Sequence, residues 1–267
     1  MNAFKVLTKK EFLQMLRDNK IIWLPLVFIL LGMTQPVVTY YLPSIIKALA
    51  GGQGIMVDPN LTALNGGEVL ASTLASQFDQ LGLMILVISM MGMIQTDKAD
   101  GMLSFIFTRP VTASSYIAGK ITSHFIMAAT SVAIGYVAST IYANYLFTDV
   151  PFSRMIPALF LYLVWVLFIV SFTAMISTIF HGQGVIALIS IVFLIGCRIT
   201  VGLSPILDII NSASLSKHAM TLLITGTISS NIVINLLVTL FWIVLILYVT
   251  NYWIANKKFK CISGNSL

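Results

Sequence analysis

Charged residues are scarce in this chain: Asp, Glu, Lys and Arg make up only 9% of its 267 residues, whereas hydrophobic residues make up 58%. A soluble domain carries about 25% charged residues to cover its surface, so the composition excludes a soluble enzyme. The mean hydropathy of +0.97 also excludes a disordered chain, because so much apolar surface does not stay solvated. The remaining class is an all-α polytopic integral membrane protein, with residues 1–267 as a single transmembrane domain.

Residues that bind metals or phosphates are equally scarce. The two cysteines, Cys197 and Cys261, offer neither a disulfide framework nor a metal-ligand spacing. The three histidines lie on separate segments, so metal or haem ligation is not expected. The sequence also lacks the Gly-x-x-x-x-Gly-Lys-Ser/Thr loop that cradles phosphates in ATPases. We therefore expect no catalytic residue, metal or cofactor in this chain, and any ATP-driven role requires a second protein.

Long runs without charge predict six membrane-spanning helices, because about 20 apolar residues cross a bilayer. The run between Arg154 and Arg198 is long enough to cross twice, and the glycines in His181–Gly184 predict a turn in its middle. Pro36 is expected to kink or end the first helix, because proline cannot donate a backbone hydrogen bond. The six predicted spans are 21–42, 76–95, 117–146, 156–180, 185–202 and 232–254.

The distribution of Lys and Arg predicts the orientation of the chain, since cytoplasmic loops carry the basic excess. With six spans, both termini lie on the same side of the membrane as the loop after the second span. Most of the 15 basic residues lie on that side, which we therefore expect to be the cytoplasmic face of the cell membrane. They are Lys5, Lys9, Lys10, Arg17, Lys20, Lys98, Arg109, Lys120, Lys257, Lys258 and Lys260. Orientation explains the net charge of +6, so no nucleic-acid partner is expected.

The N-terminal segment, 1–20, is predicted to form an amphipathic helix at the cytoplasmic surface. Its apolar and basic residues largely separate on a helical wheel, so its cations can face anionic membrane lipid. A basic tail that only fixes the orientation is the alternative. Ala48-Leu49-Ala50 resembles a signal-peptide cleavage site, but the apolar segment before it exceeds the roughly 7–15 residues of a signal peptide. We therefore expect no cleavage there.

A second unusual segment, 203–231, precedes the last span on the outer side. It mixes apolar and small residues with Asp208, Lys217 and His218. This composition is too polar for a full span and too apolar for a free loop. A re-entrant helical hairpin satisfies both observations, because its backbone can be buried against protein.

The loop between the second and third spans, 96–112, carries mixed charge, then a short apolar run, then Arg109-Pro110. Ser114 or Ser115 is expected to cap the third span by accepting hydrogen bonds from its first amides. A short apolar helix bounded by charges suits insertion into a groove on a soluble partner. The same composition also suits a helix that lies on lipid, and composition alone does not separate the two.

The pattern of this loop resembles that of ABC-2 type exporter permeases. The resemblance consists of the acidic segment Asp97 to Asp100, then Gly101-Met102-Leu103, Arg109-Pro110-Val111 and Gly119-Lys120. The family often has Glu at the acidic positions and Thr in place of Met102. The six spans, the basic amphipathic N-terminus and the tail extend the similarity along the whole chain.

The resemblance implies a permease subunit that pairs with a second permease copy, either identical or a sister chain, and with a cytoplasmic ATPase that binds ATP and magnesium. The aliphatic and Met-rich walls suit an amphiphilic or hydrophobic substrate moved outward. The segment 96–112 would couple to the ATPase. The residues that the resemblance assigns to this coupling are Asp97, Asp100, Gly101, Leu103, Phe105, Arg109 and Pro110.

Small and polar residues inside the spans give further expectations. Ser131, Gly135 and Ser139 form a small-residue stripe on the third span, which packs either against another span of the chain or against a second copy. Asp79 and Arg198 lie where their side chains can reach the outer headgroups, so we expect both to snorkel. His124, one turn beyond Lys120, is expected to be solvated rather than to be a ligand.

Two other classes of function compete with the permease. A membrane-embedded hydrolase needs a nucleophile with a base, or clustered metal ligands, at membrane depth, and the spans contain neither pattern. An ion-coupled carrier is expected to have buried carboxylates and an inverted repeat, and the sequence shows neither.

Overall fold

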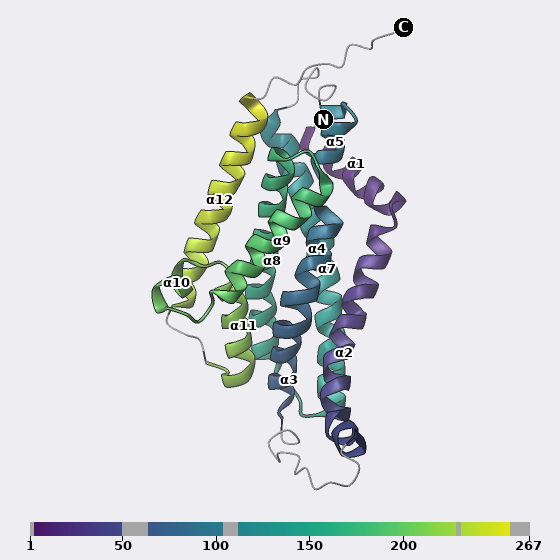
Figure 1. Cartoon of the computed structure of the whole chain (residues 1–267), viewed down its shortest axis with the longest axis vertical. Coiled ribbons are helices and arrows are strands. Elements are labelled where there is room, and N and C mark those ends of the chain that lie inside the picture. Colours follow the sequence, from purple (N-terminus) through teal and green to yellow (C-terminus); the bar gives the residue numbers. More distant parts are fainter. Residues whose placement is uncertain (1–2, 50–63, 104–111, 228–230, 257–267) are drawn as a thin grey trace.

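The computed structural model describes residues 3–49, 64–103, 112–227 and 231–256, and all regular structure in these ranges is helical. The all-α prediction is confirmed. The helices run mostly along the long axis of an elongated bundle (Figure 1). In chain order they are α1 (Ala3–Arg17), α2 (Lys20–Leu49), α3 (Gly66–Ser72), the π-helix η2 (Thr73–Gly82), α4 (Leu83–Met90), α5 (Gln95–Ala99), α7 (Ala113–Leu146), α8 (Phe152–Ile179), α9 (Gln183–Ile199), α10 (Pro205–Ile210), α11 (Ser214–Thr225) and α12 (Ile232–Asn256).

Within the described residues, five helical stretches are long and apolar enough to cross a membrane. They are Lys20–Ile46, Gly66–Ala99, Ala113–Leu146, Phe152–Ile179 and Ile232–Asn256. The remaining predicted span corresponds to α9, which is apolar but only 17 residues long. The chain is therefore a polytopic membrane protein, and each of the six predicted segments overlaps a helical stretch.

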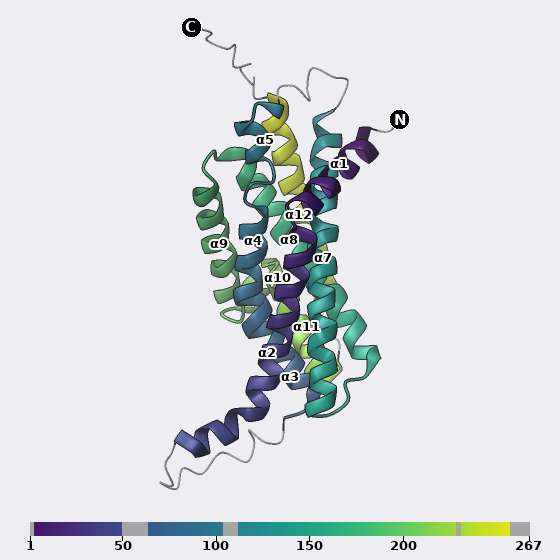
Figure 2. The same ribbon diagram turned by 90° about the vertical axis from the view of Figure 1, so that its right-hand side faces the viewer.

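Two features of helix ends differ from or narrow the predictions. Of the two outcomes predicted at Pro36, an end and a kink, the first is excluded, because α2 continues through Pro36 and Pro43 to Leu49. The lower part of α2 bends away from the bundle (Figure 2). Thr112, rather than Ser114 or Ser115, caps α7, since its hydroxyl oxygen accepts a hydrogen bond from the Ser115 amide at 3.3 Å.

The second long stretch changes its helical geometry along its length. It begins beside Asn65, whose amide donates a hydrogen bond to the Glu68 carboxylate at 3.1 Å, which is half of a capping box. The α-helix then widens into the ten-residue π-helix η2 before α4 resumes the α-helical form. π-Helical turns are rare and are frequent at functional sites, and this one carries Asp79.

The core lies around α8, which packs against α4, α7, α9, α11 and α12. Its side chains Tyr162 and Trp165 are among the largest that are fully buried. Helix α2 lies at the periphery of the chain and packs chiefly against α7. Much of the surface of α2 is therefore apolar and exposed.

Different helices lie at the two ends of the bundle. Helices α1 and α5 and the last turn of α12 lie at one end, called the α1 end, whereas α3 and α11 lie toward the other (Figures 1 and 2). The unusual segment before the last span forms the helices α10 and α11, and Gly226 at φ 71° ends α11. Both ends of the described chain therefore lie at the end that carries α5.

Candidate functional site

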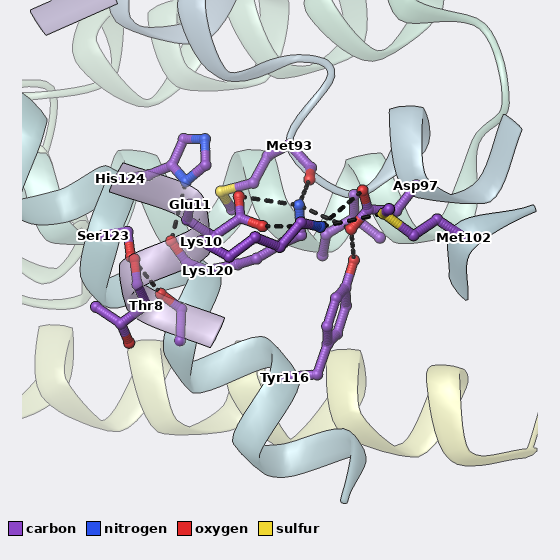
Figure 3. A network of polar contacts seen from close by, with 12 residues as sticks. Thr8, Lys10, Glu11, Met93, Asp97, Met102, Tyr116, Lys120, Ser123 and His124 are labelled. Carbon is purple, nitrogen blue, oxygen red and sulfur yellow. Dashed lines mark hydrogen bonds and ion pairs between the residues drawn. The ribbon is translucent and has the colours of Figure 1, made fainter. Parts of the chain in front are cut away.

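A buried lysine forms the centre of a charge network at the α1 end. Lys120 on α7 is only 3% exposed, and its ammonium group lies 2.9 Å from Asp97 Oδ2 and 3.1 Å from Glu11 Oε2. It also donates a hydrogen bond to the Met93 carbonyl at 2.6 Å. Glu11 lies on α1, Met93 lies just before α5, and Asp97 lies on α5 (Figure 3). One side chain therefore ties α1, α7 and the segment that leads into α5 together.

Asp97 receives a second strong hydrogen bond within the same network. The Tyr116 hydroxyl, one turn before Lys120 on α7, donates to Asp97 Oδ2 at 2.6 Å. Asp97 is 3% exposed, so neither partner can be lost to water without opening the structure. A buried carboxylate is tolerated only where it is paired and hydrogen-bonded, and Lys120 and Tyr116 together meet that condition.

Helix α1 contributes a lysine and a glutamate to the network. Glu11 is 4% exposed, and Lys10 lies 3.7 Å from its Oε1 and 4.0 Å from Asp97 Oδ1. Lys10 also donates to the Met102 sulfur at 3.1 Å. The two lysines and two carboxylates balance in formal charge. As a result α1 packs on α7 through buried charges as well as through its apolar residues.

The start of α5 is bound to the C-terminal end of α8. Ser177 Oγ accepts hydrogen bonds from the amides of Ile94 and Gln95, at 3.2 and 3.0 Å. Lys98 Nζ donates to the carbonyls of Ser177, Thr178 and Phe180 at 3.1, 2.8 and 2.7 Å, which places a cation at the C-terminus of α8. α5 is thus held from two sides, by α7 and by the end of α8.

The predicted coupling residues occupy different environments. Asp97 is buried in the network and Leu103 is 1% exposed, whereas Asp100 lies on the surface. Gly101 has φ 67°, a conformation that L side chains rarely adopt, so glycine is required at that turn. The remaining predicted residues, Phe105, Arg109 and Pro110, lie outside the described residues. Among the predicted coupling residues that the structure describes, Asp100 is therefore the exposed one, and it lies one turn beyond the buried Asp97.

A polar cavity of about 420 Å³ borders the network. Besides Lys120, Asp97 and Glu11, its lining includes Ser89 and His124. The prediction that His124 is solvated is wrong: the residue is 4% exposed, and its Nδ1 lies 3.0 Å from the Lys120 carbonyl. The cavity is large and polar enough to hold water beside the buried charges of the network.

A second buried ion pair lies between η2 and α9. Arg198 Nε on α9 is 2.7 Å from Asp79 Oδ2 on η2, and the Ser216 hydroxyl on α11 donates to the same oxygen. The expectation that Asp79 snorkels to the headgroups is wrong, because Asp79 is 1% exposed, whereas the Arg198 side chain keeps 20% of its surface exposed while it binds Asp79. The two residues are distant in sequence, and the fold brings them together as each other's partners. Their contact joins η2, α9 and α11.

The small-residue stripe on α7 lies against α2 of the same chain. A Cβ on Gly135 would approach the Phe28 carbonyl oxygen to 2.5 Å, and a Cβ on Gly32 would overlap the Gly135 carbonyl. Ser131 and Ser139 are fully buried, and the Ser139 hydroxyl donates to Thr73 Oγ1 at 3.1 Å. Backbone contact at these glycines sets the separation of α2 and α7.

Sequence reasoning missed four members of the network: Lys10, Glu11, Tyr116 and Lys120. Glu11 is the only acidic residue in the first 16 positions, and Lys120 lies one turn inside an apolar span. An isolated acid in a basic helix and an isolated lysine in a span each indicate a buried partner. Among the described residues, no group of three His, Cys, Asp or Glu side chains could hold a metal ion. The contacts of Lys120 link α1, α7 and α5.

Comparison with known proteins agrees with this architecture. The model of a family described as "ABC-2 family transporter protein" matches residues 6–254. The chain is also 37% identical over 205 residues to the uncharacterized transmembrane protein YxlG of Bacillus subtilis (strain 168). That alignment covers 77% of this chain and 79% of the relative. Since the family model spans nearly all of the described helices, the chain belongs to the ABC-2 transporter family as a transmembrane transporter subunit.

Proposed function

We propose that this chain is the permease subunit of an ATP-driven exporter, which moves an amphiphilic or hydrophobic substrate outward with energy from a separate ATPase. Two permease copies, identical or sister chains, would assemble with cytoplasmic ATPase subunits that bind ATP and magnesium. The ATPase would dock on segment 96–112. The α1 end of the bundle would then face the cytoplasm of the cell, as the basic residues of α1 favour.

One observation carries this proposal: Lys120 binds Asp97 and Glu11 at once. Removing one partner of a buried charge pair costs about 3–5 kcal/mol. A force on α5 therefore moves α1 and α7 along with it, because separating them would leave buried charges unpaired. A link of this kind is what a subunit driven from outside the membrane requires.

The surface around α5 supports a docking role. Asp100 is exposed just beyond the network, and Met102 beside it is 41% exposed. An acidic residue followed by an exposed methionine suits a partner groove with a basic rim. Lys98 and Ser177 hold the base of this surface to α8, so it is presented rigidly.

The exposed face of α2 supports contact with a second permease copy. Ile22, Leu26 and Leu30 are 65%, 53% and 56% exposed and lie along one long helix. Such an apolar face is stable against lipid or against another helix. If two permease copies met through α2, the contact between α2 and α7 would lie next to the second copy. Movement of α1, which leads directly into α2, would then reach the contact between copies.

The experiment is reconstitution of the permease with its ABC ATPase in lipid vesicles, with ATP hydrolysis measured for the complex and for the ATPase alone. Asp100→Lys should abolish the stimulation of hydrolysis by the permease while the purified permease stays monodisperse. The matched control is Asp149→Lys, an exposed aspartate at the opposite end of α7. Equal stimulation by the native and Asp100→Lys chains would refute docking at this surface.

A further inference from the structure

A second cavity lies between the long helices of the bundle, away from the charge network. Its volume is about 310 Å³, and its walls come from α8, α9 and α12. Leu207 and Ile210 of α10 close one end of it. Phe193 on α9 and Leu245 on α12 line it and are also 46% and 38% exposed. The cavity therefore opens sideways, between the outer faces of α9 and α12.

The walls of this cavity are mostly apolar and include a row of aromatic rings. The rings of Phe168, Phe172 and Phe193 are stacked, with centroids 6.2 and 4.3 Å apart and planes within 15° of parallel. The polar groups at the closed end are mostly bound within the protein: the Asn211 amide donates to the Cys197 carbonyl at 2.6 Å and to Thr200 Oγ1 at 3.0 Å. The chemistry favours an occupant without charge.

Water does not suit this cavity. Among its lining residues, only Ser212 has a buried side-chain oxygen without a hydrogen-bond partner in the described part of the chain. An ordered water needs about two to four polar partners, and a single hydroxyl does not supply them. An apolar group that fills the space would instead gain dispersion contacts with the phenylalanine rings.

The depth of the cavity indicates the source of that group. Trp242 and Leu245 lie near the middle of α12, which runs from Ile232 to Asn256, so each is about 15 Å from an end at 1.5 Å per residue. A side opening at this depth faces the hydrocarbon of the bilayer, which is about 30 Å thick. Acyl chains are the molecules present there. A helix of a second copy, about 10 Å wide, is too thick to enter.

We propose that the cavity between α8, α9 and α12 binds one acyl chain of a membrane phospholipid. The chain enters between Phe193 and Leu245 and lies along the stacked phenylalanine rings. The volume lies at the lower limit of about 300 Å³ for ligand pockets, so it accommodates a segment of one chain and not a whole lipid. This inference concerns a site remote from α5 and does not depend on the coupling to an ATPase.

The test uses the full chain in nanodiscs of phosphatidylcholine that carries a photoreactive diazirine in one acyl chain. After irradiation, peptide mass spectrometry should place adducts on the cavity residues of α8, α9 and α12 at several times the yield found on the exposed face of α2. An equal yield on all exposed faces would overturn the proposal. Crosslinks between two protein copies through the cavity would also overturn it, because they would identify a different occupant.

Variants sharpen this test. Leu245→Trp fills the mouth and should lower the cavity adducts at least fivefold, whereas Val244→Trp, on the neighbouring 64%-exposed position outside the cavity, should leave them unchanged. Phe193→Ala removes one aromatic wall at a half-exposed site and should lower the yield by a smaller factor. Unchanged adducts in both cavity variants, each monodisperse in detergent, would contradict the proposal even if the native chain is labelled there.

Discussion

The two buried charge clusters of this protein differ in what surrounds them. The network around Lys120 contains two lysines and two carboxylates, borders a polar cavity and lies beside the exposed end of α5. The Asp79–Arg198 pair contains one charge of each sign and joins η2, α9 and α11. The first cluster joins α1 and α7 to the exposed end of α5, whereas the second lies among buried helices and holds η2, α9 and α11 together.

The largest effect is expected at Lys120. Lys120→Met leaves the Glu11 and Asp97 carboxylates buried without a cation between them, and breaking such a pair costs about 3–5 kcal/mol. We expect a loss of unfolding free energy near the upper end of that range, measured by equilibrium unfolding in mixed micelles. Combining Lys120→Met with Glu11→Gln and Asp97→Asn should recover most of the loss. A triple variant as unstable as the single one would show that charge pairing is not what Lys120 contributes.

Removing Arg198 should cost more unfolding free energy than removing the charge of Asp79. Arg198→Met leaves a carboxylate whose side chain is 0% exposed, and the expected loss is about 3 kcal/mol. Asp79→Asn should lose less, about 1–3 kcal/mol, because the Arg198 side chain is 20% exposed and can reach water. The same unfolding measurement compares the two. Equal losses, or a larger loss in Asp79→Asn, would mean that the pair is more solvated than its burial indicates.

The close packing of α2 against α7 can be tested at Gly135. Gly135→Ala forces a methyl group against the Phe28 carbonyl, and overpacking of this kind costs about 1–3 kcal/mol. Gly196→Ala on α9 is the matched control, since no atom lies within 4 Å of the added Cβ. The control should be neutral or more stable by about 0.5–1 kcal/mol. Two variants of equal stability would refute close packing at Gly135.

The smallest effect is expected at the partly exposed pair of Asp208 and Lys217, 2.8 Å apart on α10 and α11. Burial acts to raise the pKa of Asp208, but hydrogen bonds from Lys217 and from the Gly202 amide outweigh it and hold the pKa below the ordinary value. A lowered pKa stabilises the fold above the unfolded-state pKa, and this contribution is lost as the pH falls through the folded-state value.

Lys217→Met should therefore cost less than about 1 kcal/mol at pH 7, because solvent and salt screen exposed pairs. The difference between the native and variant chains should shrink in 1 M salt and below the folded-state pKa of Asp208. A loss as large as that of Arg198→Met would place this pair in the same class as the buried ones.

Much of the fold could be predicted from the sequence because charges mark where spans end. The turn between α8 and α9, the helices before the last span and the six helical stretches all follow from runs without charge and from breaker residues. Helix ends are less predictable, because a proline can lie inside a helix, as Pro36 and Pro43 do in α2. The π-helix has no signature in the apolar pattern.

The buried charges could be located but not paired from the sequence. Asp79 and Arg198 each lie near the end of an apolar run, so each on its own is consistent with snorkelling, and only the fold shows that they meet. Lys120 falls in the Gly119-Lys120 motif and Glu11 in a basic helix, and the sequence gives no distance between α1 and α7 that would pair them. Asp97 was grouped with Asp100, although alternation in burial along α5 separates the two.

Site-specific photo-crosslinking from position 100 tests the central claim most directly. A photoreactive amino acid replaces Asp100 or, as the control, Asp149 in membranes that contain the chain and its ABC ATPase. The proposed role of the α5 end predicts an adduct between position 100 and the ATPase, with a yield that changes when ATP and magnesium are added, and no adduct from position 149. An ATPase adduct from position 149, or none from position 100, would contradict the claim that α5 is the coupling surface.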